Sequence, residues 1–335
     1  MSNLKKILTE NKTCKSVWFM RQAGRYLPEF RKIRLDNPNF INLCLNSKLS
    51  SEITLQPIKR FDLDSAIIFS DILIIPYALG QKVNFTKDEG PKLSNFNYNY
   101  FLQTSEKGFT EKLSPVYEAI KITRNKLKKS KTLISFVGAP WTLLIYILNL
   151  KKNKYEIDFD KLKNFPELSE IFEKLIEFIC IHIKNQIKSG ADVVQIFDSW
   201  AGLIPEDKIK EYCYIPNKKI VDFCKSEKIP NICFPKGIGK KFEEFNNFVR
   251  SDGLNIDYDV DPIWAKKKLK NVVIQGGLDP KELLKSEKDM IKVATKYIKT
   301  FIDIPYIFNL GHGLLPETDP DRVDKLIKFY RNFNG

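Results

Sequence analysis

The sequence is poor in several residue types and patterns, and each shortage excludes a class of protein. Its 335 residues include only two His and six Cys, and the Cys are scattered with no C-x-x-C pair. Such spacing forms no disulfide framework and indicates reduced thiols in a cytoplasmic protein. No apolar stretch approaches the ~20 residues of a membrane span, and Met1–Lys12 lacks the apolar run of an export signal.

Two common nucleotide-binding loops are also missing. No G-x-G-x-x-G follows the first apolar run, which argues against a dinucleotide-binding fold. The segment Gly237–Lys241 lacks both the spacing of a P-loop and the Ser or Thr that follows the P-loop Lys.

Arginine is scarce, with nine Arg against 46 Lys in a chain whose formal net charge is +14. That charge suits nucleic acid, an anionic membrane surface or an acidic small molecule as partner. Four of the nine Arg lie within fourteen residues, at Arg21, Arg25, Arg31 and Arg34. Because Arg binds carboxylates and phosphates through a planar fork, this stretch predicts directed anion binding. The alternative is a solvated helix face.

Short apolar runs rich in Ile, Val and Phe recur along the whole chain. They cover residues 66–73, 132–137, 192–198, 231–234, 253–257, 272–275 and 306–310. Amphipathic segments that suit helices alternate with them, for example 168–188, 205–225 and 279–302. Continuous apolar runs of this length are typical of buried parallel strands, and the alternation predicts a parallel α/β fold.

The runs number seven, whereas a (β/α)8 barrel needs eight strands. Val17–Met20 and Phe245–Arg250 are both candidates for the eighth, and an open doubly wound sheet stays possible from the pattern alone. The length suits one barrel domain over residues 1–335. Within it, residues 1–15 form an N-terminal arm, and residues 87–129 form a surface excursion plus one crossover helix.

Polar or Gly-containing tails follow several of these runs. They are Ser70-Asp71, 138–142, 198–202, 276–279 and 309–313. Because the carboxyl ends of all strands in a parallel barrel open on one face, we expect these tails to converge there into an active site.

Individual residues in the tails are candidates for chemistry. Asp71 ends an apolar run, so its carboxylate should be partly desolvated, although a helix cap or an ion pair would place it equally well. Asp198-Ser199 is equally ambiguous. Tyr146 should lie one turn inside a helix that Pro140 begins, where it reaches the barrel mouth or simply packs.

The two His differ in their surroundings. His312 lies between Gly311 and Gly313, which permit close approach of a ligand, so we predict a functional role for it. His182 follows Cys180 by two residues in a helical segment, where the two side chains diverge. This pair suits packing better than a metal.

One motif decides among these interpretations. In the stretch Trp18–Arg31 (WFMRQAGRYLPEFR), Arg21 and Arg25 lie on the two sides of Gly24. As a string, this stretch closely resembles the first signature of the uroporphyrinogen decarboxylase family. Further blocks resemble the family in the same order, at 68–73, 137–143, 195–202 and 309–313. The chain departs from the family pattern at Tyr77, Gly277 and 255–258.

The resemblance implies a homodimer of single-domain (β/α)8 barrels that uses no metal and no organic cofactor. The implied reaction removes CO2 from the four acetate side chains of uroporphyrinogen III and gives coproporphyrinogen III, in haem biosynthesis. The substrate is a tetrapyrrole with eight carboxylates, so clustered Arg and a positive net charge are appropriate for binding it.

The resemblance also assigns roles to residues. Asp71 would accept hydrogen bonds from the pyrrole N–H groups and stabilise positive charge on the ring. Arg21 and Arg25 would hold the reacting carboxylates, with Arg34 as a further anion contact. Tyr146, Ser199 and His312 would contact substrate carboxylates or the reacting edge, and Gln22, Ala23 and Gly24 complete the substrate-binding stretch.

Two other functions compete with this one. Corrinoid-dependent methyltransferases resemble the family in sequence and fold, but they need zinc, and the H-x-C pair that usually binds it is missing here. A nucleic-acid-binding protein would explain the charge, yet the Lys residues are spread over polar segments rather than gathered in a stripe.

Overall fold

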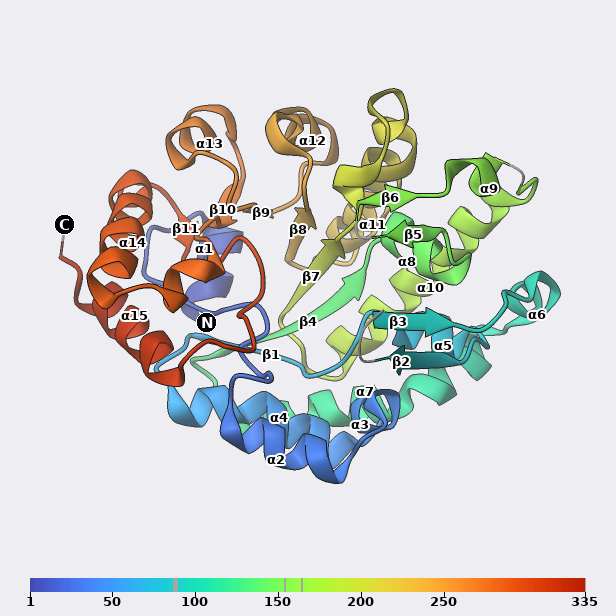
Figure 1. The fold of residues 1–335 in the computed structure, drawn as a ribbon, viewed down its shortest axis with the longest axis horizontal. Helices are drawn as coiled ribbons and strands as arrows, with labels where there is room; N and C mark the ends of the chain where they lie inside the picture. The colour runs from blue at the N-terminus through green and yellow to red at the C-terminus, as the bar shows by residue number, and fades with distance from the viewer. Residues whose placement is uncertain (87–89, 154, 164, 335) are drawn as a thin grey trace.

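A curled parallel sheet forms the centre of the molecule (Figure 1). The computed structural model describes residues 1–86, 90–153, 155–163 and 165–334. The sheet has seven strands in the order β1 (Ser65–Ile67), β4 (Thr132–Gly138), β7 (Val193–Asp198), β8 (Asn231–Pro235), β9 (Gly253–Ile256), β10 (Val273–Gly276) and β11 (Tyr306–Ile307). Every pairing is parallel, so the predicted parallel α/β fold is confirmed. Strand order follows chain order, without the reversal of a doubly wound sheet.

The two edge strands are shorter than predicted. The run 66–73 leaves the sheet after Ile67 and leads into α5 (Ile74–Ala78). In the run 306–310, Phe308 forms a parallel bridge with Val17 instead of extending β11. The segments that follow these two strands therefore begin earlier than the apolar pattern indicated, and their first residues are buried and apolar.

Residues 16–18 lie between these two edges. Phe308 N donates to Ser16 O at 2.9 Å, and Trp18 N donates to Phe308 O at 3.3 Å. On the other side, Asp64 N donates to Val17 O at 2.9 Å, next to the start of β1. The alternative candidate, Phe245–Arg250, is wrong as an eighth strand, because Phe245–Val249 belong to α12 (Phe242–Val249).

Helices cover the outer face of the sheet (Figure 1). They include α4 (Ser47–Arg60), α7 (Glu106–Lys126), α10 (Leu168–Lys188), α11 (Ile215–Ser226), α12, α13 (Pro262–Lys268), α14 (Glu287–Phe301) and α15 (Pro320–Asn332). The helix predicted over 168–188 is confirmed as α10. The segment 205–225 is instead divided into η2 (Glu206–Lys208), the π-helical η3 (Lys210–Tyr214) and α11, and 279–302 is divided into η5 (Pro280–Leu284) and α14.

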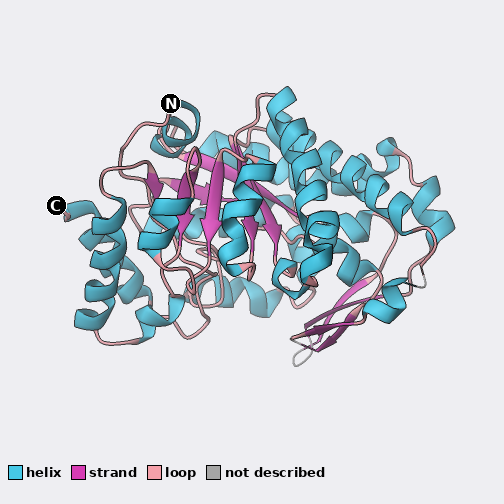
Figure 2. Cartoon of the chain, turned by 90° about the horizontal axis from the view of Figure 1, so that it is seen from above, coloured by secondary structure: helices cyan, strands magenta, loops and turns pink. Residues whose placement is uncertain are grey.

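Shorter elements decorate the ends of the sheet. Further helices are α2 (Pro28–Asp36), α3 (Phe40–Cys44), α6 (Tyr98–Gln103), α8 (Pro140–Ile147), α9 (Phe159–Lys163), η1 (Ala201–Leu203) and η4 (Gly239–Lys241). Two antiparallel hairpins, β2 (Val83–Thr86) with β3 (Gly90–Leu93) and β5 (Lys151–Asn153) with β6 (Glu156–Ile157), lie beyond the carboxyl ends of the strands (Figure 2). Residues 87–89 of the predicted excursion lie outside the described residues. Within the described ranges, no helix is long and apolar enough to cross a membrane.

The inside of the curl is filled from its amino end by α1 (Asn3–Glu10), which lies within the predicted N-terminal arm. Leu4, Ile7 and Leu8 of this helix pack with inward-facing residues of the strands, such as Ile134 and Ile232. A polar layer follows toward the carboxyl end. It is centred on Gln275, which accepts from Trp18 Nε1 at 3.0 Å and donates to Asn255 Oδ1 at 2.9 Å. Since this end is filled, a substrate site is left to the carboxyl face.

His182 is a packing residue, as predicted. It lies fully buried between α7 and α10, with Nδ1 3.0 Å from the Tyr117 hydroxyl and Nε2 2.9 Å from Gln186 Nε2. Burial lowers the pKa of His182 to about 3, so the ring is neutral at physiological pH.

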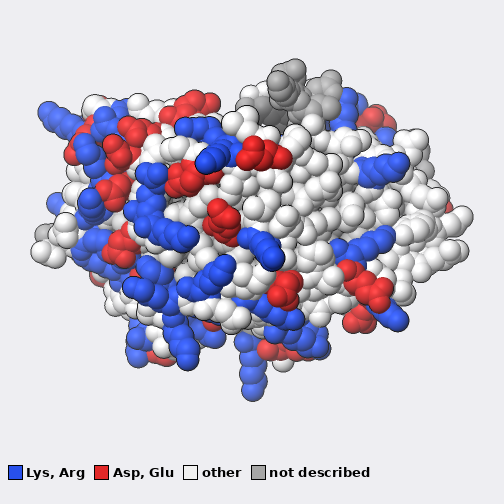
Figure 3. Space-filling view, turned by 90° about the horizontal axis from the view of Figure 1, so that it is seen from below, with Lys and Arg blue, Asp and Glu red and all other residues white. Residues whose placement is uncertain are grey.

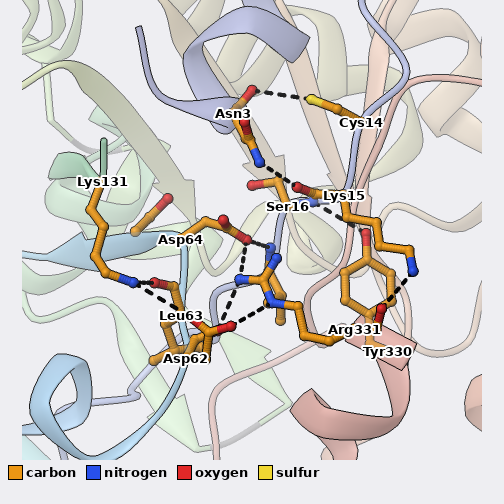
Figure 4. A network of polar contacts seen from close by, with 12 residues as sticks. Asn3, Cys14, Lys15, Ser16, Asp62, Leu63, Asp64, Lys131, Tyr330 and Arg331 are labelled. Atoms are coloured by element: carbon orange, nitrogen blue, oxygen red, sulfur yellow. Dashed lines mark hydrogen bonds and ion pairs between the residues drawn. The ribbon is translucent and has the colours of Figure 1, made fainter. Parts of the chain in front are cut away.

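A polar network ties residues 16–18 to the C-terminal helix (Figure 4). Asp64 Oδ2 accepts from Val17 N at 2.7 Å and lies 2.8 Å from Arg331 Nη2 of α15. Burial raises the pKa of Asp64, and the Arg331 charge opposes that rise. Arg331 therefore compensates a desolvated carboxylate at the junction between β1, residues 16–18 and α15.

Replacing Arg331 by Gln should lower the free energy of unfolding by about 2–3 kcal/mol, because Asp64 would lose its main cationic partner. Urea denaturation measures the change. Arg322→Gln is a matched control on the same helix, since Arg322 lies 3.8 Å from the half-exposed Glu287, a pair worth less than ~1 kcal/mol. Equal losses in the two variants would contradict a special role for Arg331.

Candidate active site

The Arg-containing loop after residue 20 is fixed by Gln22. The Gln22 side chain accepts from Phe19 N at 3.0 Å and donates to Ser65 O at 2.9 Å. The main-chain carbonyl of Gln22 accepts from the Tyr26 hydroxyl. These bonds tie the loop to the start of β1. The Gln22 N–H also donates to Phe19 O at 3.0 Å, and the whole residue is only 1% exposed, so Gln22 holds the loop instead of contacting a substrate as predicted.

Arg21 has an unusual backbone conformation, and its side chain lies against Gly313. Its φ is +61°, a left-handed conformation that non-Gly residues adopt rarely and often at functional sites. Its side chain crosses Gly313, so a Cβ on that glycine would lie 2.4 Å from Arg21 Cδ and 2.9 Å from Nε. Arg21 is accessible to solvent yet crowded by protein atoms. This crowding and the Arg25 charge lower the pKa of its guanidinium, whereas Asp71 raises it.

Asp71 lies in the tail after β1, where a partly desolvated carboxylate was predicted. Its Oδ1 accepts from Leu73 N at 2.8 Å. Burial raises the pKa of Asp71 to about 6, and the Leu73 hydrogen bond and the Arg21 charge pull it downward. The carboxylate is therefore a desolvated anion near physiological pH, within electrostatic reach of Arg21.

Tyr146 joins this pair from α8, the helix that begins at Pro140 as predicted. It is half-buried, and its ring meets Trp200 edge-on with centroids 6.2 Å apart. Burial raises the pKa of the Tyr146 hydroxyl, the Asp71 charge raises it further, and the Arg21 charge lowers it. Arg21, Asp71 and Tyr146 come from three segments far apart in sequence, yet each lies within electrostatic reach of the other two.

Asp198 and Ser199 differ in burial, and the structure separates their roles. Asp198 is buried and accepts from Thr142 Oγ1 at 2.7 Å and from Asn217 Nδ2 at 3.0 Å. Its carboxylate is thus committed to holding α8 and α11 against β7. Ser199, the next residue, is half-buried at the carboxyl end of β7.

His312 lies in the tail after β11, directly before Gly313, which the Arg21 side chain crosses. Its Nδ1 accepts from Gly313 N at 2.6 Å, which leaves Nε2 to carry the proton of the neutral ring. Leu314 N donates to Met20 O at 2.9 Å and joins this tail to the loop of Arg21.

The other predicted residues of the loop are closer to solvent. Arg25 is exposed. Arg31 fixes the main chain there by donating to the Arg25 and Tyr26 carbonyls at 3.0 Å. Arg34 is turned toward the end of α2, where it donates to Asn37 O and lies over the Phe40 ring at 5.7 Å. Ala23 and Gly24 are half-buried in the turn between Arg21 and Arg25.

An aromatic surface on the inner face of the sheet was not predicted from the sequence. Phe136 of β4, Phe197 of β7 and Phe234 of β8 form a row, with ring centroids 5.7 Å and 6.5 Å apart. Phe136 and Phe197 remain partly exposed. Each lies two residues beyond an inward-facing residue of its strand, so the period of two could have identified them.

Two surface hollows of about 830 Å³ each lie elsewhere. One is between α4, α7 and α10 on the outside, and the other is at the amino ends of β9 and β10. Neither touches Arg21, Asp71, Tyr146 or His312. The chemistry of the side chains therefore locates the site better than the size of a hollow does.

Comparisons with known proteins agree with the motifs. The family model described as uroporphyrinogen decarboxylase (URO-D) matches residues 4–333. The chain belongs to the uroporphyrinogen decarboxylase family. The uroporphyrinogen decarboxylase of Rickettsia bellii is 42% identical over 328 residues, which cover 95% of this chain and 94% of that protein. The enzyme of the same name from Wolbachia pipientis is 41% identical over 321 residues, with the same coverage.

Solved structures support the fold. A methyltransferase from Methanosarcina mazei matches with a TM-score of 0.75 at 16% identity, over 98% of this chain and 97% of that one. At this identity the likeness concerns the fold alone. Among the residues that the structure describes, no group of three or more His, Cys, Asp or Glu could hold a metal ion. The family resemblance read from the motifs is thus confirmed, and this methyltransferase shares the fold.

Proposed function

We propose that this chain catalyses the decarboxylation of the four acetate side chains of uroporphyrinogen III to give coproporphyrinogen III. The observation that carries the proposal is the cluster of Arg21, Asp71 and Tyr146 at the carboxyl end of the sheet, in a chain of this family. A desolvated anion flanked by Arg suits a substrate whose pyrrole N–H groups are donors and whose edge carries carboxylates.

The reaction exchanges CO2 for a proton at each acetate. Protonation of a pyrrole carbon makes the ring an electron sink, the C–C bond to the carboxylate breaks, and its electron pair neutralises the ring. A second proton on the former acetate carbon completes the methyl group, while the ring returns its first. Because the pyrrole supplies the sink itself, we assign no cofactor.

Asp71 is the residue that we assign to the cationic ring. Its carboxylate accepts the pyrrole N–H groups and stabilises the charge that develops on protonation, an effect that is strong because the carboxylate is desolvated. Arg21 and Arg25 hold the carboxylates, with Arg34 outside them. Guanidinium is a poor acid, so a water held by Arg21 or by His312 delivers the proton.

The remaining predicted contacts surround this centre. Tyr146, Ser199 and His312 contact carboxylates or the reacting edge, and the half-buried turn of Ala23 and Gly24, which Gln22 holds in place, offers its main chain. The exposed parts of Phe136 and Phe197 suit the apolar face of the macrocycle. Lys and Arg are interspersed with Asp and Glu over the face in Figure 3 and form no stripe there, so the net charge of +14 acts as a general attractive field for an anionic substrate.

We also propose a closed (β/α)8 barrel over residues 1–335 as a single domain, with Val17–Met20 as the eighth strand. The parallel bridge from Val17 to Phe308 and the hydrogen bond from Asp64 to Val17 support this closure. The family resemblance further suggests a cytoplasmic homodimer. Size-exclusion chromatography with light scattering tests the dimer.

The reaction itself has a direct test. Anaerobic incubation of the purified chain with uroporphyrinogen III should yield products with seven, six, five and finally four carboxylates, counted by chromatography after oxidation. A folded sample that leaves all eight carboxylates in place would contradict the proposed function.

A further inference from the structure

Two charged residues at the carboxyl ends of β8 and β9 are assigned no role above. Lys236 follows β8, and Asp257 follows β9. Asp257 is only 4% exposed, and its Oδ2 accepts from Gly237 N at 2.6 Å, while its Oδ1 has no hydrogen-bond partner. Buried carboxylate oxygens without partners are rare and often mark a functional position.

The strand register sets these residues beside Ser199. Asp198 of β7 pairs with Pro235 of β8, and Cys233 of β8 pairs with Leu254 of β9. Continuing the same register brings Ser199, Lys236 and Asp257 into one row across the three strands.

All three positions have the inward-facing parity of their strands. Ile232 and Phe234 of β8 belong to the inner cluster, and Lys236 is the next residue of that series. On β9, Asn255 bonds to Gln275 inside the curl, and Asp257 lies two residues farther on.

The two charges also interact across the neighbouring strands. Burial raises the pKa of Asp257 to about 7, the hydrogen bond from Gly237 N and the Lys236 charge pull it downward, and the Asp259 charge adds a further rise. Lys236 is half-buried, so part of the residue is accessible to solvent at this end of the sheet. An ammonium that is attracted by a buried carboxylate on the neighbouring strand is partly ordered before any ligand arrives, and this ordering lowers the entropic cost of binding an anion.

The position of β8 in the sheet places Lys236 relative to Arg21. In the order β1-β4-β7-β8-β9-β10-β11, β8 is the central strand, and residues 16–18 lie between the two edges. Lys236 is therefore on the far side of the mouth from Arg21. Arg21, Arg25 and Arg34 all belong to one side, whereas a macrocycle carries carboxylates around its whole edge.

We propose that Lys236 is a further substrate-binding residue, which takes a carboxylate on the side of the mouth opposite Arg21, and that Asp257 positions it. This inference rests on the proposed function, because it takes a tetrapyrrole polycarboxylate as the ligand. Asp257 acts through Lys236 and through the Gly237 main chain, which its Oδ2 fixes.

Kinetics of Lys236→Met with uroporphyrinogen III test the inference. Loss of one charge-assisted contact should raise KM about tenfold or more with kcat changed less than about threefold, and Lys236→Arg should restore most of the affinity. Asp257→Asn keeps an oxygen for Gly237 N but removes the charge, so it should also raise KM. Lys267→Met on α13 is the control for net charge, because Lys267 is exposed on an outer helix, and its KM should stay unchanged.

The contradicting results are equally defined. A KM for Lys236→Met within about twofold of the unaltered chain would overturn the inference, since a bound carboxylate contact is worth more. Failure of both Lys236→Met and Lys236→Gln to fold would also overturn it, because the pair would then serve stability. An unaltered chain without activity would instead contradict the proposed function.

Discussion

Replacing Asp71 by Asn should lower kcat by about 10²- to 10³-fold and leave most substrate affinity in place. The amide has nearly the same shape and can still accept from Leu73 N, which now bonds to Oδ1 at 2.8 Å. It lacks the negative charge that stabilises a protonated pyrrole. The loss therefore falls on the transition state rather than on the ground-state complex.

The same substitution should not destabilise the fold. Burial raises the pKa of Asp71 from 3.8 to about 6, so the ionised carboxylate opposes folding above that range, and the opposition is relieved as pH falls from 6 toward 3.8. Asn removes this cost at pH 7, and the melting temperature should stay equal or rise. In the unaltered chain, kcat/KM should fall as pH drops below about 6, because the charge on Asp71 is lost.

Asp198→Asn provides the contrast. Burial raises the pKa of Asp198 to about 6 as well, but both of its oxygens accept from protein donors, Thr142 and Asn217. An amide there would turn its NH2 toward one of these donors, so the variant should melt earlier with kcat per folded molecule retained. Near-normal turnover of Asp71→Asn would contradict the role of Asp71 in charge stabilisation.

The sheet was largely predictable from the sequence because both faces of its strands are buried. Residues 132–137 and 231–234 are continuous apolar runs that no other element of that length explains. Residues 16–18 were harder, since they bridge both edges without forming a regular strand, and the apolar segment Phe245–Val249 was equally plausible until α12 accounted for it.

The candidate site was predictable where a residue type is rare in its surroundings. Arg21, Asp71 and His312 stood out against Lys-rich or apolar segments. Gln22 shows the limit, because a polar residue within a recognised motif serves the loop and not the mouth. Lys236 and Asp257 could not be singled out among 46 Lys and many Asp, since only the register and burial set them beside Ser199.

Replacing Gly313 by Ala should lower kcat/KM by about 10²-fold with little change in stability. The new Cβ would lie 2.4 Å from Arg21 Cδ and 2.6 Å from Cγ, so the Arg21 side chain must move. An exposed, flexible side chain can do so at low cost to the fold. The guanidinium would then leave the position from which it interacts with Asp71 and Tyr146.

Gly311→Ala, two residues earlier, separates this effect from crowding in general. Its Cβ would lie 2.3 Å from Tyr258 N and 2.8 Å from the Asp257 carbonyl carbon, and a main chain cannot yield as a side chain does. We therefore expect a clear drop in melting temperature for Gly311→Ala and none for Gly313→Ala, measured beside initial rates under anaerobic conditions. If Gly313→Ala kept normal kcat/KM, the reaction would not depend on where Arg21 lies, and the assignment of Arg21 to the reacting carboxylate would be wrong.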